Sequence, residues 1–170
     1  MKTAVVYYSR THTTEDIAKD IDLELDADVL QVKSSLYPLG FTGYVRAIFH
    51  ALNESMQPIE TDHWDLTQYD LVIVGSPVWG AHMSSPIRSF LMQYASQIKD
   101  VAYYVTCGGS GADAAIAKMI ELGQKRPVAT MKITSADITD ETFERKISAF
   151  TEEIRRAKIH TLGHHTNLPA

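Results

Sequence analysis

Short apolar runs alternate along the chain with longer segments in which apolar residues recur every three or four positions. The short runs are typical of buried strands, and the longer segments are typical of amphipathic helices. The predicted strands are residues 3–8, 27–32, 71–74, 101–106 and 128–133. The predicted helices are residues 15–25, 44–53, 85–98, 112–122 and 139–157. Because long helical crossovers separate successive strands, we expect a parallel sheet with helices on both faces.

Local signals refine three of these helices. Thr13 or Thr14 is the expected N-cap of the first helix, and Gly123 is the expected C-terminal cap of the fourth. The helix at 44–53 carries its apolar side chains, Val45, Ile48, Phe49 and Leu52, on one side.

Composition limits the class of protein. The chain has 170 residues, 45% of them apolar, a net charge of −5 and one cysteine, Cys107. These values predict one globular domain at 1–158, and they argue against nucleic acid as the main partner. With no signal peptide, no apolar stretch long enough for a membrane span and no cysteine pair, we expect a cytoplasmic protein.

The last residues, 159–170, are expected to form a flexible tail. They include His160, His164 and His165, but no carboxylate or cysteine accompanies these imidazoles. We therefore predict no metal site.

A cluster of hydroxyl side chains follows the first predicted strand. Its residues are Ser9, Arg10, Thr11, His12, Thr13 and Thr14, and a helical pattern begins directly after them. The first N–H groups of a helix have no partner within the helix, and the positive end of its dipole favours an anion. Hydroxyl donors and an arginine add to the same attraction. The sequence therefore predicts a phosphate site at this corner.

Two further unusual loops follow the third and fourth strands. Residues 75–80 read Gly-Ser-Pro-Val-Trp-Gly, and residues 107–111 read Cys-Gly-Gly-Ser-Gly. In an open parallel sheet, ligands lie beyond the carboxyl ends of the strands where the strand order reverses. In the order 2-1-3-4-5 the three loops converge there. A ligand with a phosphate at one end and a flat ring at the other would contact all three.

These segments resemble the flavodoxin family, and the similarity covers nearly the whole chain. Family members open with a strand and a Ser/Thr-x-Thr-Gly-x-Thr loop that holds the phosphate of FMN. Here Ser9, Thr11 and Thr14 match that loop, and His12 stands in place of its glycine. The segments 75–80 and 107–111 resemble the second and third flavin loops, and 37–44 is similar to a segment of related flavodoxins.

The resemblance implies a flavodoxin-like three-layer sandwich with a five-stranded parallel sheet of order 2-1-3-4-5, and FMN as the cofactor. The residues expected to bind FMN are Ser9, Arg10, Thr11, His12, Thr13, Thr14, Ser76, Pro77, Val78, Trp79, Gly80, Cys107, Gly108, Gly109 and Gly111. Histidine at position 12 would be strained if that position requires a positive φ, and its imidazole could enter the phosphate pocket.

Some of these residues also have a purely structural interpretation. Trp79 either stacks on the flavin ring or packs in the core, and Tyr37, Phe41 and Tyr44 either wall the crevice or pack beneath their loop. Cys107 is expected to act as a small apolar residue. His82 is a weak candidate for proton donation, and no other catalytic side chain is expected because the flavin carries the chemistry.

Other classes fit the sequence less well. Residues 109–114 match a dinucleotide fingerprint ending in alanine, but they follow the fourth strand, not the first. A phospho-acceptor receiver domain needs aspartates where this chain has Ser9 and Ser76, and a Gly-x-Ser-x-Gly hydrolase elbow is absent.

Three functions stay open at this stage. The favoured one is an oxidoreductase that passes electrons from NAD(P)H or another donor to a quinone or similar acceptor through FMN. The second is a flavodoxin-type carrier between partner proteins, and the third is a flavin-free relative. The sequence leaves the oligomeric state open, a homodimer included.

Overall fold

A parallel sheet of order β2-β1-β3-β5-β6 lies at the centre of the molecule, and the short strand β4 pairs antiparallel with the end of β3. The structure is a computed structural model that describes residues 1–61 and 64–165, with side chains described through residue 157. The strands are β1 (Thr3–Tyr7), β2 (Asp28–Gln31), β3 (Leu71–Trp79), β4 (His82–Met83), β5 (Asp100–Cys107) and β6 (Thr130–Thr134). This arrangement confirms the predicted fold class and order, with β5 and β6 as the fourth and fifth parallel strands.

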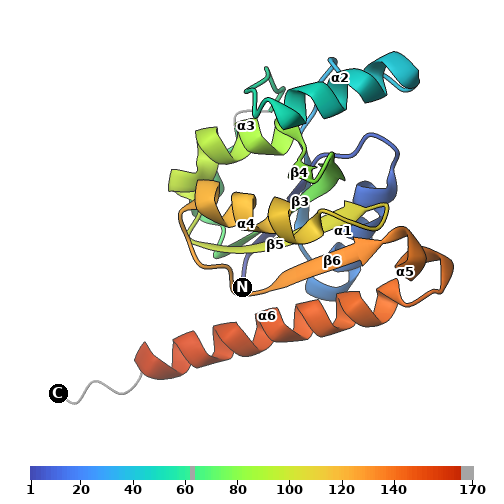
Figure 1. The fold of residues 1–170 in the computed structure, drawn as a ribbon. Coiled ribbons are helices and arrows are strands. Elements are labelled where there is room, and N and C mark those ends of the chain that lie inside the picture. The colour runs from blue at the N-terminus through green and yellow to red at the C-terminus, as the bar shows by residue number, and fades with distance from the viewer. Residues whose placement is uncertain (62–63, 166–170) are drawn as a thin grey trace.

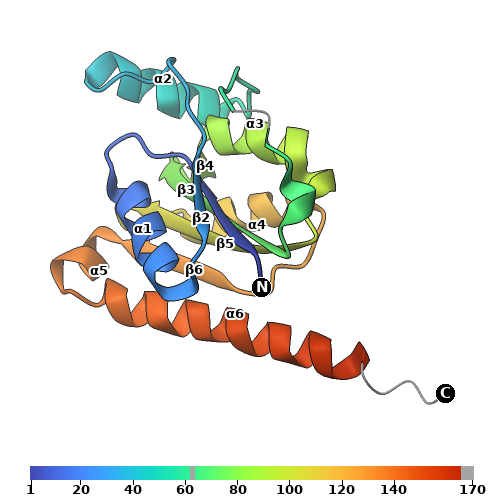
Figure 2. The same ribbon diagram turned by 180° about the vertical axis from the view of Figure 1, so that it is seen from behind.

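Helices cover both faces of the sheet (Figures 1 and 2). They are α1 (Thr13–Leu25), α2 (Phe41–Leu52), α3 (Ser85–Tyr94), α4 (Ala112–Gly123), α5 (Ser135–Thr139) and α6 (Phe143–His165), with 3-10 turns at Leu66–Gln68 and Ala95–Gln97. α2, α3 and α4 lie on one face, and α1 and α6 lie on the other.

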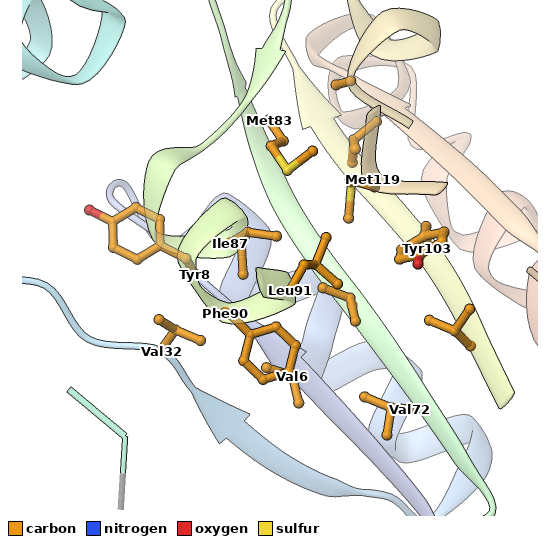
Figure 3. Close-up of a cluster of buried hydrophobic side chains, with 14 of the residues drawn as sticks. Val6, Tyr8, Val32, Val72, Met83, Ile87, Phe90, Leu91, Tyr103 and Met119 are labelled. Carbon is orange, nitrogen blue, oxygen red and sulfur yellow. The ribbon is translucent and has the colours of Figure 1, made fainter. Parts of the chain in front are cut away.

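Two apolar cores result from the alternation of side chains along each strand. Val72 of β3 and Tyr103 of β5 face α3 and α4, where Phe90 and Met119 pack against the sheet (Figure 3). The neighbouring strand residues point the other way, toward α1 and α6. Because both faces are covered, the strands read as continuous apolar runs.

β3 is longer than predicted, because residues 75–79 continue the strand instead of forming a loop. Pro77 is tolerated there since β1 ends opposite Gly75, so Pro77 itself pairs with β5 alone. The chain then turns through Gly80 and Ala81 into β4, which pairs with Val78 and Trp79.

Several predicted helix ends are also corrected. The N-cap of α1 is His12, not Thr13 or Thr14, and the left-handed cap of α4 is Gln124, not Gly123. Gly123 lies inside α4, where a Cβ would stand 1.9 Å from the Tyr103 hydroxyl. The predicted last helix is α6, which begins at Phe143 instead of residue 139 and continues eight residues past the predicted end, to His165; α5, just before it, was not predicted.

The predicted tail at 159–170 therefore begins inside α6, and residues 166–170 lie outside the described part of the chain. The side chains of His160, His164 and His165 are also outside it. Within the described residues, no helix has both the length and the apolar character needed to cross a bilayer.

α2 is unusual because its larger apolar side chains face outward. Its buried residues are Gly43, Ala47 and Ala51, which are small, whereas Phe41 and Phe49 are 80% and 62% exposed. The face that carries Val45, Phe49 and Leu52 is thus the solvent face of this chain.

Candidate functional site

A cavity of about 240 Å³ opens at the carboxyl ends of β1, β3, β5 and β6. It lies where the order of the sheet reverses, the usual ligand position in such folds. Its lining residues are Arg10, Thr11, Thr13, Thr14, Tyr44, Pro77, Val78, Trp79, Thr106, Cys107, Gly108, Ile133, Ser135 and Ile138. All three sequence-predicted loops therefore contribute to one cavity.

The hydroxyl loop after β1 forms one end of this cavity. Thr11 and Thr13 line it, and the Oγ of Ser9 is buried without a hydrogen-bond partner among the described residues. Thr14 is buried, and its Oγ1 lies 2.7 Å from Oγ1 of Thr106 at the end of β5. A buried hydroxyl that lacks a partner costs free energy, so Ser9 Oγ is a candidate donor to a ligand at this corner, although Ser9 is not among the cavity-lining residues.

His12 has the positive φ that glycine would adopt freely, with a value of 69°. Its imidazole does not line the cavity; Nδ1 lies 3.0 Å from a carboxylate oxygen of Glu15, and the side chain is 75% exposed. Hydrogen bonds from Lys19 and from His12 lower the pKa of Glu15. The structure thus gives His12 backbone strain, and its imidazole stays out of the cavity at the corner where the sequence predicts a phosphate.

Arg10 is turned toward the loop that precedes α2. Its Nη2 donates to the carbonyl oxygens of Pro38 at 3.1 Å and Gly40 at 2.7 Å, and its guanidinium lies 5.9 Å from the centre of the Tyr44 ring. Arg10 and Tyr44 both line the cavity. Arg10 therefore joins the β1 loop to the start of α2, and its charge stays beside the cavity.

The second predicted loop divides between the cavity and the protein interior. Pro77, Val78 and Trp79 line the cavity. Ser76 does not, because it is fully buried and its Oγ accepts from the Ser84 N–H at 2.9 Å, which fixes the turn into β4. Gly80, with φ 57°, forms that turn and also lies outside the cavity lining.

Trp79 was predicted either to stack on a flavin ring or to pack in the core, and it shows features of both. It lines the cavity, but it is only 7% exposed, and its ring meets Tyr8 and Tyr37 edge-on at centroid distances of 5.5 and 5.0 Å. Burial, with a smaller contribution from Tyr37, raises the pKa of Tyr8 to about 12. The tyrosines of this cluster are therefore uncharged at neutral pH, and the three aromatic rings pack tightly against one another.

The glycines near these loops serve packing as much as ligand access. A Cβ at Gly75 would stand 2.1 Å from the Tyr104 ring, and a Cβ at Gly111 would stand 2.5 Å from Cα of Ala81. Gly111, with φ 84°, is the N-cap of α4. In the third loop, Cys107 and Gly108 line the cavity, whereas Gly109 and Gly111 do not.

A fourth wall comes from the end of β6, which the sequence interpretation left out. Ser135 and Ile138 of α5 line the cavity beside Ile133. α5 begins with a capping box in which Thr134 and Asp137 bond reciprocally. That Thr-x-x-Asp spacing was the available sequence signal for a helix start at this point.

His82 lies away from the cavity. Its Nδ1 is 4.0 Å from Glu54, which also faces Arg88 and Lys118. Of the aromatic residues in the segment 37–44, Tyr44 of α2 lines the cavity, Tyr37 packs in the core, and Phe41 of α2 is exposed.

A larger hollow of about 580 Å³ lies at the other end of the sheet, around residues 124–130 at the start of β6. It contains none of the three predicted loops. Within the described part of the chain, no group of three or more histidine, cysteine, aspartate or glutamate side chains has the arrangement of a metal site.

The model of one protein family, described as flavodoxin, matches residues 2–150 of the chain. The chain belongs to the flavodoxin family. No curated protein matches it. Among solved structures, this flavodoxin-family chain resembles a flavoprotein from Lactobacillus acidophilus in complex with FMN, with 24% identity and a TM-score of 0.68 over 82% of this chain and 97% of that one.

The apo-form of the Lactobacillus acidophilus flavoprotein is similar too, with 26% identity and a TM-score of 0.64 over 81% of this chain and 95% of that one. Oxidised flavodoxin 1 from Bacillus cereus shares 18% identity, with a TM-score of 0.54 over 91% of this chain and 98% of that one. These likenesses support the same fold along most of the chain.

Proposed function

We propose that this flavodoxin-family chain binds FMN in the cavity at the carboxyl end of the sheet and works as a redox protein. The observation that carries the proposal is the corner after β1, where Thr11 and Thr13 line the cavity and Ser9 Oγ, in the same loop, is buried with no partner in the described residues. The FMN complex of the Lactobacillus acidophilus relative supports this choice of cofactor.

The phosphate end would be held by Ser9, Thr11 and Thr13 together with the first N–H groups of α1. These N–H groups have no partner within the helix, and the 13-residue helix presents the positive end of its dipole there. Hydrogen bonds to a charged group contribute about 1.5–3 kcal/mol each, so two or three of them would dominate the affinity.

The ring end would lie among Tyr44, Trp79, Cys107 and Ile138, whose apolar surfaces line the rest of the cavity. Bound FMN supplies the electron transfer itself, and the protein contributes binding, orientation and the electrostatics of its surroundings. Trp79 is fixed by its contacts with Tyr8 and Tyr37, so this wall is set before the ligand arrives.

The favoured activity is transfer of electrons from NAD(P)H or another donor to a quinone or similar flat acceptor. The modest net charge of −5, and the aromatic ring of Tyr44 in the cavity lining, support a reaction with a small molecule over an encounter between charged proteins that is steered by their fields.

The test has two stages. The purified protein, or the apo-protein titrated with FMN, should show the visible absorbance bands of bound flavin. Oxidation of NADH and NADPH is then followed with and without a quinone. Turnover supports the oxidoreductase, a coloured protein with no turnover with any quinone leaves the carrier, and a colourless protein that does not respond to FMN contradicts the proposal.

A further inference from the structure

We propose that the exposed face of α2 is the dimer interface of this protein and packs against α2 of a second copy. The α2 apolar surface consists of Leu39, Phe41, Tyr44, Val45, Phe49 and Leu52, all of them exposed. At 3.6 residues per turn, those on the helix cover an arc of roughly 140°. The opposite side of α2 packs against the chain's own core through small residues.

The size of the α2 apolar surface fits a stable interface. An aromatic side chain has roughly 200 Å² to bury, so the exposed parts of Phe41, Tyr44 and Phe49 alone amount to roughly 400 Å². Leu39, Val45 and Leu52 extend this surface beyond what a soluble monomer normally leaves open, and toward the ~800 Å² per partner of a standard interface.

The composition of the α2 apolar surface favours a second copy of this chain as its occupant over a transient protein partner. Within α2, Arg46 is the one residue of fixed charge. Homodimer interfaces are more apolar and poorer in charge than transient ones, which rely on charged rims for rapid encounter. One helix meeting its own copy about a twofold axis also satisfies the self-complementarity of an isologous contact.

The rest of the described chain does not cover this surface. α6 ends at the opposite side of the molecule from α2 (Figures 1 and 2). Since Tyr44 belongs to the α2 apolar surface and also lines the cavity, the second copy would lie directly beside the site. The proposed dimer does not depend on bound FMN. Its test therefore measures the mass of the protein in solution and not the absorbance of bound flavin.

The test is the mass of the full chain in solution, measured by light scattering at micromolar concentrations. We expect twice the 19.0 kDa of one chain. Phe49→Asp should raise the dimer dissociation constant roughly 30-fold or more, as for a central aromatic contact. Leu23→Asp is the matched control, since Leu23 is 83% exposed on α1, and it should leave the dimer unchanged.

A second measurement locates the contact. In a Cys107→Ser background, Val45→Cys should form a disulfide-linked dimer when diamide oxidises the two thiols, whereas Leu23→Cys should not. Far-UV circular dichroism checks that each variant is folded. A monomer at every concentration, or a Phe49→Asp protein that dimerises like the wild type, would overturn the proposal.

Discussion

The hydroxyl oxygens of Thr14 and Thr106 lie 2.7 Å apart in the protein interior, although 92 residues separate them along the chain. This hydrogen bond joins the loop after β1 to the end of β5. The buried hydroxyl of Tyr104 reinforces the connection, because it donates to the Thr14 carbonyl at 2.9 Å. The two bonds therefore fix the start of α1 against the sheet at the corner proposed to hold the phosphate.

The Thr14–Thr106 bond should show strong coupling in a double-mutant cycle. Thr14→Val or Thr106→Val alone leaves one buried hydroxyl without its partner, at a cost of about 1–3 kcal/mol. The double variant removes both hydroxyls and should lose less than the sum of the two single changes. Urea unfolding of the apo-protein measures the three free energies, and strict additivity would show that the two side chains act independently.

Ser9→Ala should separate ligand binding from stability. Because Ser9 Oγ has no partner in the described chain, its loss should leave the free energy of unfolding of the apo-protein unchanged or slightly raised. FMN affinity should fall roughly tenfold or more, the effect of one hydrogen bond to a charged group. A variant that binds FMN like the wild type would mean that Ser9 does not face the phosphate.

His12→Gly should relieve backbone strain at φ 69°. The expected gain is about 1 kcal/mol, offset in part by loss of the contact with Glu15 and by the greater freedom of glycine in the unfolded chain. We expect equal or higher stability and equal or tighter FMN binding. His12→Ala is the matched control because it keeps the strain, and it should be the less stable of the two. The reverse ranking would show that the imidazole contact outweighs the strain.

Asp137 should give a stability contribution that depends on pH. Hydrogen bonds from Lys146 and Thr134 hold the pKa of this carboxyl well below its ordinary value. A lowered pKa stabilises the folded state above the ordinary value, near pH 4, and this contribution is lost as the pH falls below it. Asp137→Ala should therefore cost about 1 kcal/mol at pH 7, mainly through the lost capping box, and less at pH 3.

Denaturant unfolding of wild type and variant at the two pH values measures the difference. Asp140→Ala, at the other end of α5, is the control and should have little effect at either pH. A cost for Asp137→Ala that does not change with pH would contradict the assigned role of the charge. Since Ser135 and Ile138 line the cavity, the same variant should also weaken FMN binding modestly.

The sheet order and the meeting of the three loops at one cavity could be predicted from the sequence, because alternating strands and crossovers allow few topologies. Strain at His12 is predicted only on the condition that this position requires a positive φ, and the φ of 69° meets that condition. The length of β3 did not, because Pro77 signals a loop unless the neighbouring strand is known to end opposite Gly75. Residue type alone could not separate Ser9 from Ser76, whose hydroxyl is bonded inside the β3–β4 turn.

α2 illustrates a different limit of sequence patterns. Periodicity groups Val45, Ile48, Phe49 and Leu52 on one side of a helix, and in the structure Val45, Phe49 and Leu52 are exposed together whereas Ile48 is half-buried beside Gly80. It could not say whether this side meets the chain's own core, because Ala47 and Ala51 on the other side provide a second, smaller apolar face. The space between α2 and the neighbouring β3 and α3 decides which face of α2 packs inward. Small residues on that face allow the helix to approach these elements more closely.

The central claim is that FMN is anchored by its phosphate at the corner after β1, and a comparison of FMN with riboflavin tests it most directly. Both are titrated into the apo-protein while flavin fluorescence and visible absorbance are followed. Losing two charge-assisted hydrogen bonds predicts that riboflavin binds at least roughly 100-fold more weakly than FMN, and that inorganic phosphate competes with FMN. Equal affinity for the two flavins, or no spectral change with either, would contradict the account.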